Sequence, residues 1–252
     1  MMLSPEILRI ILLLSLVATG YVLILTWNED SKSPKPSPKN LISETLAALG
    51  ARIFQKEFNF PVIGIPGTID NEISGTQYTI GYDTAINTVI DAIDKIRDTA
   101  SSHNRLFFVE VMGRDAGHIA LNAGIGAGAE EILIPEENLG LDRLLESLKR
   151  SEKSGKSSSI VVVAEGEKSG KNVYEIAAYV EKNLPYYEVR VSVLGHMQRG
   201  GTPTCFDRVL ASRMGVYAVE KLISGNSNAM VGVIDEKMML TLSLIHISEP
   251  TR

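Results

Sequence analysis

Three glycine-containing stretches of the sequence carry side chains that could move a proton or bind a phosphate. The first is GIPGTIDNE at residues 64–72, which follows a short apolar run. Its proline and glycines let the backbone turn sharply and approach a ligand, and the Asp70 carboxylate beside the Thr68 hydroxyl could then act as a general base. The alternative is an ordinary turn in which Asp70 or Asn71 caps nearby backbone amides.

The second stretch is VMGRDAGH at residues 111–118, which lies between an expected strand and an expected helix. Backbone amides at the start of a helix, together with the guanidinium of Arg114, suit a phosphoryl group. The alternative is an exposed ion pair between Arg114 and Asp115, which would contribute little to stability.

The third stretch is VLGHMQRGG at residues 193–201. It places an imidazole, an amide and a guanidinium, those of His196, Gln198 and Arg199, in a glycine-rich loop. The alternative is a solvated connection. Because all three stretches follow expected strands and carry related chemistry, we favour one shared site over three unrelated loops.

An alternation of strands and helices positions these stretches. Apolar runs predict strands, and apolar residues at helical spacing predict helices. The predicted strands span residues 60–65, 106–111, 131–134, 160–164, 189–194 and 229–234, and the predicted helices span residues 82–98, 117–128, 141–153, 174–183 and 208–223. This alternation predicts an α/β fold with one or more mainly parallel sheets and helices on both faces. Ligands bind at the carboxyl ends of the strands in such sheets, which is where the three stretches lie.

The composition argues against several classes of protein. The 252 residues carry 25 Lys and Arg against 30 Asp and Glu, a net charge of −5, which excludes a basic nucleic-acid-binding protein. The single cysteine, Cys205, cannot form an internal disulfide, and we expect it to be a buried thiol. The 4 histidines with one thiol give no zinc-ligand cluster. Residues 155–157 and 166–172 lack the spacing of a phosphate-binding P-loop.

The two ends of the chain differ in character from its body. Residues 10–27 contain no charge and approach the roughly 20 residues needed to cross a bilayer, which makes residues 1–27 a candidate membrane anchor. The alternative is a stretch joined to the natural gene in error. Residues 28–49 begin with a linker rich in Pro, Ser and Lys, whose lysines favour a cytoplasmic body. Residues 242–252 resemble the translation of a sequencing-library adapter, so we expect the natural chain to continue beyond Thr241.

Short motifs within residues 50–241 are similar, in order and spacing, to those of the bacterial ATP-dependent 6-phosphofructokinase family. They are PGTIDN at residues 66–71, GYDTA at 81–85, MGR at 112–114, AEG at 164–166, GHMQRGG at 195–201 and DR at 207–208. The resemblance implies a cytoplasmic, glycolytic enzyme that transfers the γ-phosphoryl group of ATP to the 1-hydroxyl of fructose 6-phosphate. It also implies Mg²⁺ as a cofactor and a homotetramer whose sugar site spans two subunits.

The resemblance assigns roles to individual residues. It makes Asp70 the base that accepts the sugar hydroxyl proton, with Thr68 and Arg114 beside the transferring phosphoryl group. Glu165 would hold sugar hydroxyls. The other substrate-binding residues would be Arg105, Met112, Gly113, Arg190, His196, Met197, Gln198 and Arg199, of which Arg105 and Arg190 would reach across a subunit interface.

The resemblance also implies an effector site and a phosphoryl donor. The effector-binding residues would be Arg97, Gly128, Ala129, Glu130 and Lys156. Ser154, Ser157 and Ser158 stand where the family often carries basic residues, which argues against effector control. Gly67 stands where the diphosphate-using branch carries lysine, which favours ATP as the donor.

The sequence departs from the family in the part that binds ATP and magnesium. The family's glycine-rich start and its Gly-Gly-Asp-Gly-Ser loop should precede residue 50, and neither occurs there. Glu72 replaces the second aspartate of the Thr-Ile-Asp-Asn-Asp motif. We therefore expect this chain, as written, to lack kinase activity. The competing hypothesis is a non-catalytic, membrane-tethered protein that binds sugar phosphates; a dinucleotide oxidoreductase is disfavoured because its fingerprint is missing.

Overall fold

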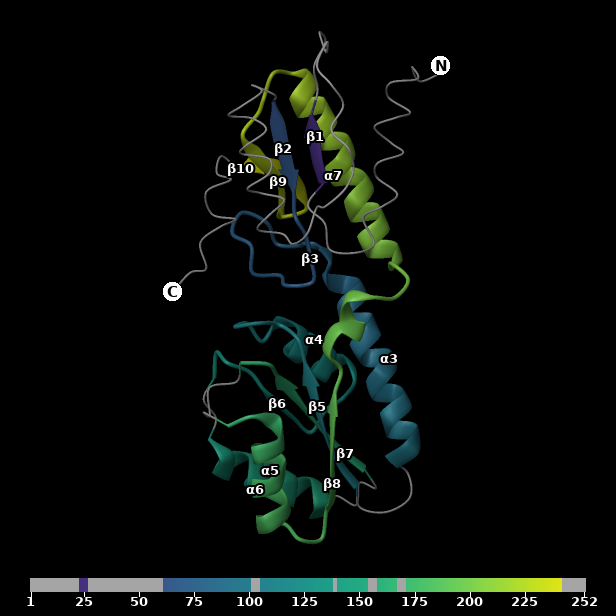
Figure 1. Ribbon diagram of the computed structural model, residues 1–252, viewed down its shortest axis with the longest axis vertical. Helices are drawn as coiled ribbons and strands as arrows, with labels where there is room; N and C mark the ends of the chain where they lie inside the picture. The colour runs from purple at the N-terminus through teal and green to yellow at the C-terminus, as the bar shows by residue number, and fades with distance from the viewer. Residues whose placement is uncertain are drawn as a thin grey trace. The chain divides into compact units, whose positions relative to one another are not determined.

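The computed structural model describes residues 23–26, 61–100, 105–137, 140–153, 158–166 and 171–241. The chain divides into two compact units (Figure 1). Unit 1 comprises Met1–Asp83 and Thr202–Arg252, and unit 2 comprises Thr84–Gly201. Each unit has a four-stranded sheet of its own, so each provides a separate framework for the residues that it carries.

The sheet of unit 2 is entirely parallel. Its strands are β5 (Arg105–Val111), β6 (Glu131–Leu133), β7 (Ser158–Ala164) and β8 (Glu188–Val193), in the order β6-β7-β5-β8. The central strands β5 and β7 are buried along almost their whole length, as the Val-rich runs in the sequence predict. All four carboxyl ends therefore lie at one edge of the sheet.

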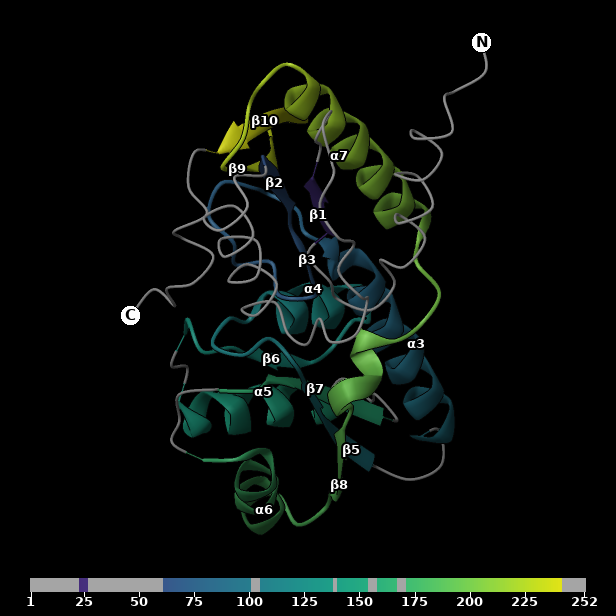
Figure 2. The ribbon, with the colours of Figure 1, turned by 45° about the horizontal axis from the view of Figure 1, so that its top comes forward.

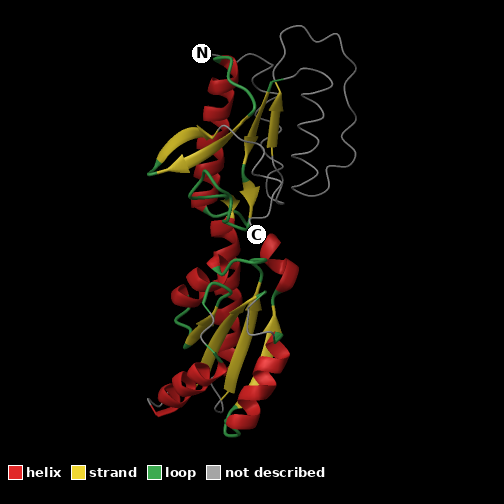
Figure 3. Ribbon diagram, turned by 90° about the vertical axis from the view of Figure 1, so that its left-hand side faces the viewer, coloured by secondary structure: helices red, strands yellow, loops and turns green. Residues whose placement is uncertain are grey.

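Helices cover both faces of this sheet, as the sequence predicts (Figure 3). On one face, α5 (Leu141–Lys153) and α6 (Val173–Asn183) pack on a cluster that includes Phe108 and Leu133. On the other face lies α4 (His118–Gly126), where a Cβ at Gly124 would come within 2.7 Å of Ile132. Successive strand residues point to opposite faces of a sheet, so Ile132 packs toward α4 while the next residue, Leu133, packs toward α5 and α6.

A long helix and local caps complete unit 2. Helix α3 (Tyr82–Ala100) begins in unit 1 and continues in unit 2 beside the end of α4, where a Cβ at Gly126 would lie 3.0 Å from Ile90. Helix α6 begins with a capping box, in which Asn172 and Glu175 each accept the other's backbone N–H. This pair fixes the start of α6 by satisfying amides that the helix leaves unpaired.

The sheet of unit 1 is mixed. Its strands are β1 (Leu23–Thr26), β2 (Val62–Ile65), β9 (Ala229–Ile234) and β10 (Lys237–Thr241), in the order β1-β2-β9-β10. Strands β2 and β9 are parallel, whereas β1 and β10 pair antiparallel with their neighbours. Helix α7 (Cys205–Ile223) lies along this sheet and buries apolar side chains against it (Figure 2). A short ladder joins β3 (Gly67–Thr68) to β4 (Ile80–Gly81).

The antiparallel edge formed by β10 was not predicted from the sequence. Strands β9 and β10 are joined by Asp235 and Glu236, both in the left-handed region at φ 48° and 65°. Two such residues make the tight turn of a hairpin, which Asn-Gly or Asp-Gly normally marks in a sequence. An Asp-Glu pair carries no such signal, so the sequence predicted mainly parallel sheets without indicating this antiparallel strand.

Cys205 is exposed, so the expectation of a buried thiol is wrong. It is the first residue of α7, directly after Thr204, whose side chain accepts the N–H of Asp207 as an N-cap. The predicted helix begins at residue 208 and omits this first turn. The cap moves the helix start three residues toward the N-terminus and leaves Cys205 on its solvent side.

The N-terminal apolar run has one described segment. Leu23–Thr26 form β1 and pair with β2 through contacts such as Leu23 with Ile65. The rest of the predicted membrane span, the linker at residues 28–49 and the tail at residues 242–252 lie outside the described residues. In the part of the chain that the structure describes, no helix is both long and apolar enough to cross a bilayer.

The loop that follows Asp70 is tied to β9. The Val233 N–H donates to Thr76 Oγ1 at 3.1 Å, and the Gln77 N–H donates to the Val233 carbonyl at 2.8 Å. Next to these bonds the Gly75 carbonyl faces Gly232, where a Cβ would lie only 2.0 Å from the oxygen. Gly232 therefore allows a backbone contact that no other residue permits.

We expect Gly232→Ala to destabilise unit 1 by roughly 1–3 kcal/mol, because the added Cβ meets backbone that cannot move aside. The change should lower the guanidinium chloride concentration at the midpoint of unfolding and speed hydrogen exchange of the β9 backbone amides. Gly126→Ala in α4 is the matched control, since its Cβ would meet only the flexible end of Ile90. Equal losses in the two variants would contradict the proposed contact.

Candidate functional site

The carboxyl ends of three neighbouring strands of unit 2 bring together most of the predicted catalytic and substrate-binding residues. Met112, Gly113 and Arg114 follow β5, and Glu165 follows β7. The 3-10 helix η2 (Gly195–Arg199) comes one residue after β8. Since β7, β5 and β8 are adjacent in the sheet, the second and third sequence stretches form one cluster, as predicted.

Arg114 has a left-handed backbone, at φ 55°. This conformation costs a non-glycine residue on the order of 1–2 kcal/mol. The Glu165 carboxylate offsets the cost, because its Oε1 accepts the N–H of Arg114 at 2.8 Å and that of Gly113 at 3.3 Å. Gly166 lies against the same turn, where a Cβ would come within 2.6 Å of the Arg114 carbonyl oxygen. Glu165 and Gly166 thus fix the backbone that carries the exposed Arg114 side chain.

Gln198 joins the second stretch to the third. Its side chain is 1% exposed; Oε1 accepts the Met112 N–H at 3.1 Å, and Nε2 donates to the Gly195 carbonyl at 3.0 Å. The other polar side chains of η2, His196 and Arg199, are exposed. The short helix therefore directs one amide inward and two basic groups outward.

A carboxylate binds the N-cap amide of α4, at the helix start that the sequence suggested for a phosphoryl group. The Glu136 carboxylate accepts the Gly117 N–H at 2.8 Å from Oε1 and 3.1 Å from Oε2. A protein carboxylate thus occupies the positive end of this helix, where a phosphoryl group was expected. With Glu165 holding the amides of Gly113 and Arg114, the exposed guanidinium of Arg114 is the cationic side chain that this stretch offers to an anion.

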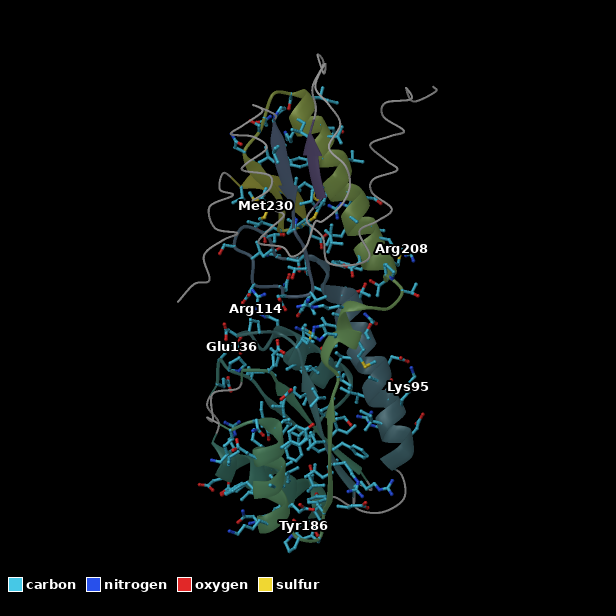
Figure 4. The ribbon with its side chains drawn as sticks, in the orientation of Figure 1. Lys95, Arg114, Glu136, Tyr186, Arg208 and Met230 are labelled. Carbon is cyan, nitrogen blue, oxygen red and sulfur yellow. The ribbon has the colours of Figure 1, made fainter. Side chains whose placement is uncertain are left out.

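Arg105 and Arg190 lie at the opposite edge of the sheet. The Arg105 Nε pairs with Glu188 Oε2 at 3.3 Å, and Arg190 pairs with the other oxygen of Glu188. Arg105 begins β5 and Val111 ends it, which separates the two edges by roughly 20 Å of extended chain. In Figure 4, Arg114 and Glu136 lie at one end of unit 2, and Tyr186, just before β8, lies at the other. Four side chains were predicted to bind the 6-phosphate. Within one chain they lie in two separate places, with Arg105 and Arg190 at the amino ends of the strands and His196 and Arg199 beyond the carboxyl ends.

Thr68 and Asp70 belong to unit 1. Thr68 is buried, and its Oγ1 accepts the Asp70 N–H at 3.2 Å. The next side chain caps the turn, because Asn71 Oδ1 accepts the Thr79 N–H at 2.9 Å and Asn71 Nδ2 donates to the Gln77 carbonyl at 2.9 Å. The turn alternative thus holds for Asn71, while the same bonds fix the backbone on both sides of the half-buried Asp70.

Four predicted effector residues gather at the carboxyl end of α4. Arg97 donates to the Ala127 carbonyl, and the Ala129 N–H donates to the Gly124 carbonyl at 2.8 Å. Gly128 has φ +64° with open space around it, and Glu130 Oε2 accepts the Ile160 N–H at 2.5 Å. Lys156 lies outside the described residues. Arg97 and Glu130 hold the fold here, and the effector role of the group stays a prediction.

The described residues do not form a magnesium site. Within them, no three His, Cys, Asp or Glu side chains gather closely enough to hold a metal ion. We therefore assign no step of the chemistry to Mg²⁺.

Two carboxylates at the site were missed by the sequence analysis. Glu136 caps α4 from a loop, and no local pattern marks it. Glu110 lies within the buried strand β5, and its pKa is raised by burial and, secondarily, by the negative charge of Glu165. A charged residue inside the run LFFVEV was the available signal for Glu110.

Comparison with known proteins identifies the family. The sequence pattern of the phosphofructokinase family matches residues 44–222, which is most of the chain. The chain belongs to the phosphofructokinase family. It is 54% identical over 190 residues to ATP-dependent 6-phosphofructokinase 2 of Bacteroides thetaiotaomicron and 53% identical over 191 residues to ATP-dependent 6-phosphofructokinase of Listeria welshimeri. Each match covers 75% of this chain and 58% of the relative, so the chain spans little more than half the length of these phosphofructokinases.

Solved structures confirm the predicted fold class. Phosphofructokinase from Saccharomyces cerevisiae matches with a TM-score of 0.68 and 34% identity, over 73% of this chain and 26% of that one. A pyrophosphate-dependent phosphofructokinase from Marinobacter aquaeolei matches with a TM-score of 0.64 over 81% of this chain and 58% of its own. At 23% identity, the second match supports the fold alone.

Gly166→Ala and Gly140→Ala form a matched pair, since both glycines have positive φ, at +78° and +69°. A Cβ costs each position on the order of 1–2 kcal/mol through its backbone conformation. Only at Gly166 does the Cβ also meet the Arg114 carbonyl, whereas Gly140 has open space. We expect Gly166→Ala to lose roughly 1–3 kcal/mol more in urea unfolding and to shift the Arg114 amide resonance. Similar losses would show that the contact with Arg114 is unimportant.

We expect Glu110→Gln to stabilise the protein at pH 7 and above. The raised pKa means that the folded state holds the proton more tightly than the unfolded state, so folding stability falls as pH rises through the folded-state pKa. Glutamine removes this penalty, and the advantage should vanish well below the ordinary pKa of 4.5. Thermal melts of the variant across pH test this, with exposed Glu181→Gln as the control; a gain that is independent of pH would contradict it.

Proposed function

We propose that the carboxyl edge of the unit 2 sheet is the sugar-phosphate half of a 6-phosphofructokinase active site. The observation that supports this is the convergence of two loops, in which Glu165 fixes the Arg114 backbone and Gln198 fixes η2. The convergence leaves Arg114, His196 and Arg199 exposed at one edge. The relatives named ATP-dependent 6-phosphofructokinase support fructose 6-phosphate and ATP as the substrates.

In the proposed reaction, Asp70 accepts the proton of the sugar 1-hydroxyl as that oxygen attacks the γ-phosphorus of ATP. The bond from the γ-phosphorus to the bridging oxygen breaks, and ADP leaves. Phosphoryl transfer needs aligned reactants and neutralised phosphoryl oxygens more than covalent help. By the family resemblance, Arg114 would supply positive charge to those oxygens, and Thr68, whose Oγ1 accepts the Asp70 N–H, would act with Asp70.

The sugar is held by groups of both signs. Glu165 uses Oε1 to hold the backbone, and we propose that Oε2 accepts a sugar hydroxyl. Met112 and Gly113 would lie against the sugar, while His196 and Arg199 would bind the 6-phosphate. Arg105 and Arg190, at the far edge of the sheet, would complete the same site in a neighbouring subunit of a homotetramer.

This 252-residue chain by itself is proposed to bind the sugar phosphate without turnover. Supporting this, the glycine-rich nucleotide and magnesium loops of the family do not occur before residue 50. We also propose, from the family, that unit 2 is located in the cytoplasm. We propose separately that the residues near Gly128 form an effector site. The membrane-tethered alternative gains no support from the described residues, in which Leu23–Thr26 pair with β2.

Calorimetric titration of the full chain should detect binding of fructose 6-phosphate and none of fructose, because the basic groups recognise the phosphate. We expect Arg199→Gln to weaken binding roughly tenfold or more, the loss typical of a charge-assisted hydrogen bond. Exposed Arg150→Gln in α5 is the matched control and should bind like the parent.

The outcome against the proposal is equal affinity for fructose and fructose 6-phosphate, or equal effects of the two arginine substitutions. A coupled assay with ATP tests the absence of turnover separately. Formation of fructose 1,6-bisphosphate by the purified chain would refute that part of the proposal and leave the binding site in place.

A further inference from the structure

Gln198 is one of few buried polar side chains among the described residues, and it lies in the middle of an otherwise exposed short helix. It is 1% exposed, while Met197 is 50% exposed and both His196 and Arg199 face solvent. A 3-10 helix has three residues per turn, so a single side chain can point inward while its neighbours point outward. The burial of Gln198 therefore follows from the conformation of η2.

Both ends of the Gln198 amide are used by the protein itself. Oε1 accepts the Met112 N–H at 3.1 Å, and Nε2 donates to the Gly195 carbonyl at 3.0 Å. A carboxamide has further lone-pair and N–H capacity, but here that capacity lies beneath the surface. This argues against the direct contact with sugar that the family resemblance implies for Gln198.

The bonds of Gln198 complete a chain of contacts across the site. Glu165 holds the amides of Gly113 and Arg114, and the adjacent amide of Met112 is held by Gln198. Gln198 then holds the start of its own helix through Gly195. The loop that carries Arg114 and the helix that carries Arg199 are thereby joined side chain to backbone.

We propose that Gln198 is a positioning residue, which fixes η2 against residues 112–114 so that Arg114 and Arg199 are presented together to one sugar phosphate. The proposal rests on the proposed function for the identity of the ligand. It differs from a ligand role because Gln198 acts through Met112 and Gly195 and does not touch the sugar.

The test uses the full chain, labelled with ¹⁵N, and two substitutions. Gln198→Met has similar length and makes neither hydrogen bond, whereas Gln198→Glu keeps an acceptor for Met112 and loses the donor to Gly195. We expect Gln198→Met to speed exchange of the Met112 amide about tenfold or more, with Phe108 in β5 unchanged, and Gln198→Glu to restore most of the protection. Exposed Lys149→Gln is the control and should change neither amide.

Binding of fructose 6-phosphate gives the second readout. We expect Gln198→Met to weaken binding about tenfold and Gln198→Glu to lie between it and the parent. In the parent complex we expect no nuclear Overhauser effect between the Gln198 Nε2 protons and the sugar. Such an effect would overturn the proposal, as would parental Met112 exchange and parental affinity in Gln198→Met.

Two further outcomes are decisive. If Gln198→Met does not fold, Gln198→Glu and the parent complex settle the question, because the Overhauser effect and the Met112 amide can be measured in both. If the parent binds no fructose 6-phosphate, the proposed function fails, and with it any role of Gln198 toward this ligand. Binding by the parent with a direct Gln198 contact overturns the positioning role alone.

Discussion

The site in unit 2 depends on one carboxylate that holds two consecutive backbone amides. Glu165 can reach Gly113 and Arg114 because β7 lies beside β5 in a fixed register, with Ala164 opposite Val111. The Glu165 N–H continues this ladder and donates to the Val111 carbonyl at 2.8 Å. A slip of one residue would turn every side chain of the strand to the other face, which the helices on both faces forbid. The apolar core thus sets the position of the charged loop.

The same contacts decide which groups remain to bind an anion. Backbone amides near a helix start attract phosphates, yet Glu165 already holds those of Gly113 and Arg114, and Glu136 holds that of Gly117. The exposed side-chain cations therefore become more important for the attraction, and the fold has to fix the direction in which they point. The left-handed turn at Arg114 and the 3-10 helix at Arg199 both exert that control through the backbone.

The strands and helices of unit 2 could be predicted from the sequence because the apolar patterns that mark them are local and repeated. In unit 2 the helix Leu141–Lys153 has the predicted bounds, as does the strand Ala229–Ile234 of unit 1, and the other predicted elements of the α/β alternation differ by a few residues at their ends. What escaped prediction lacked a local signal: the hairpin at Asp235 and Glu236, the two-residue strands β3 and β4, and β1 within a run that resembles a membrane span. At the site, motifs indicated which loops matter. They did not indicate that Gln198 turns inward or that Glu136 fills a helix end, since both depend on partners distant in the chain.

The placement of the arginines is a direct consequence of a parallel sheet. Every strand runs the same way, so a residue that begins β5 or lies early in β8 is kept near the amino edge, while the loops after them lie at the carboxyl edge. Arg105 and Arg190 are held at the amino edge by Glu188, in ion pairs whose partly exposed groups gain little net energy from the contact. If the phosphate of a bound sugar replaced Glu188 as the partner of these two arginines, it would therefore displace only a weak interaction. Within one chain these arginines therefore lie apart from His196 and Arg199, which is the separation that the proposed sharing of one site between two copies of the chain requires.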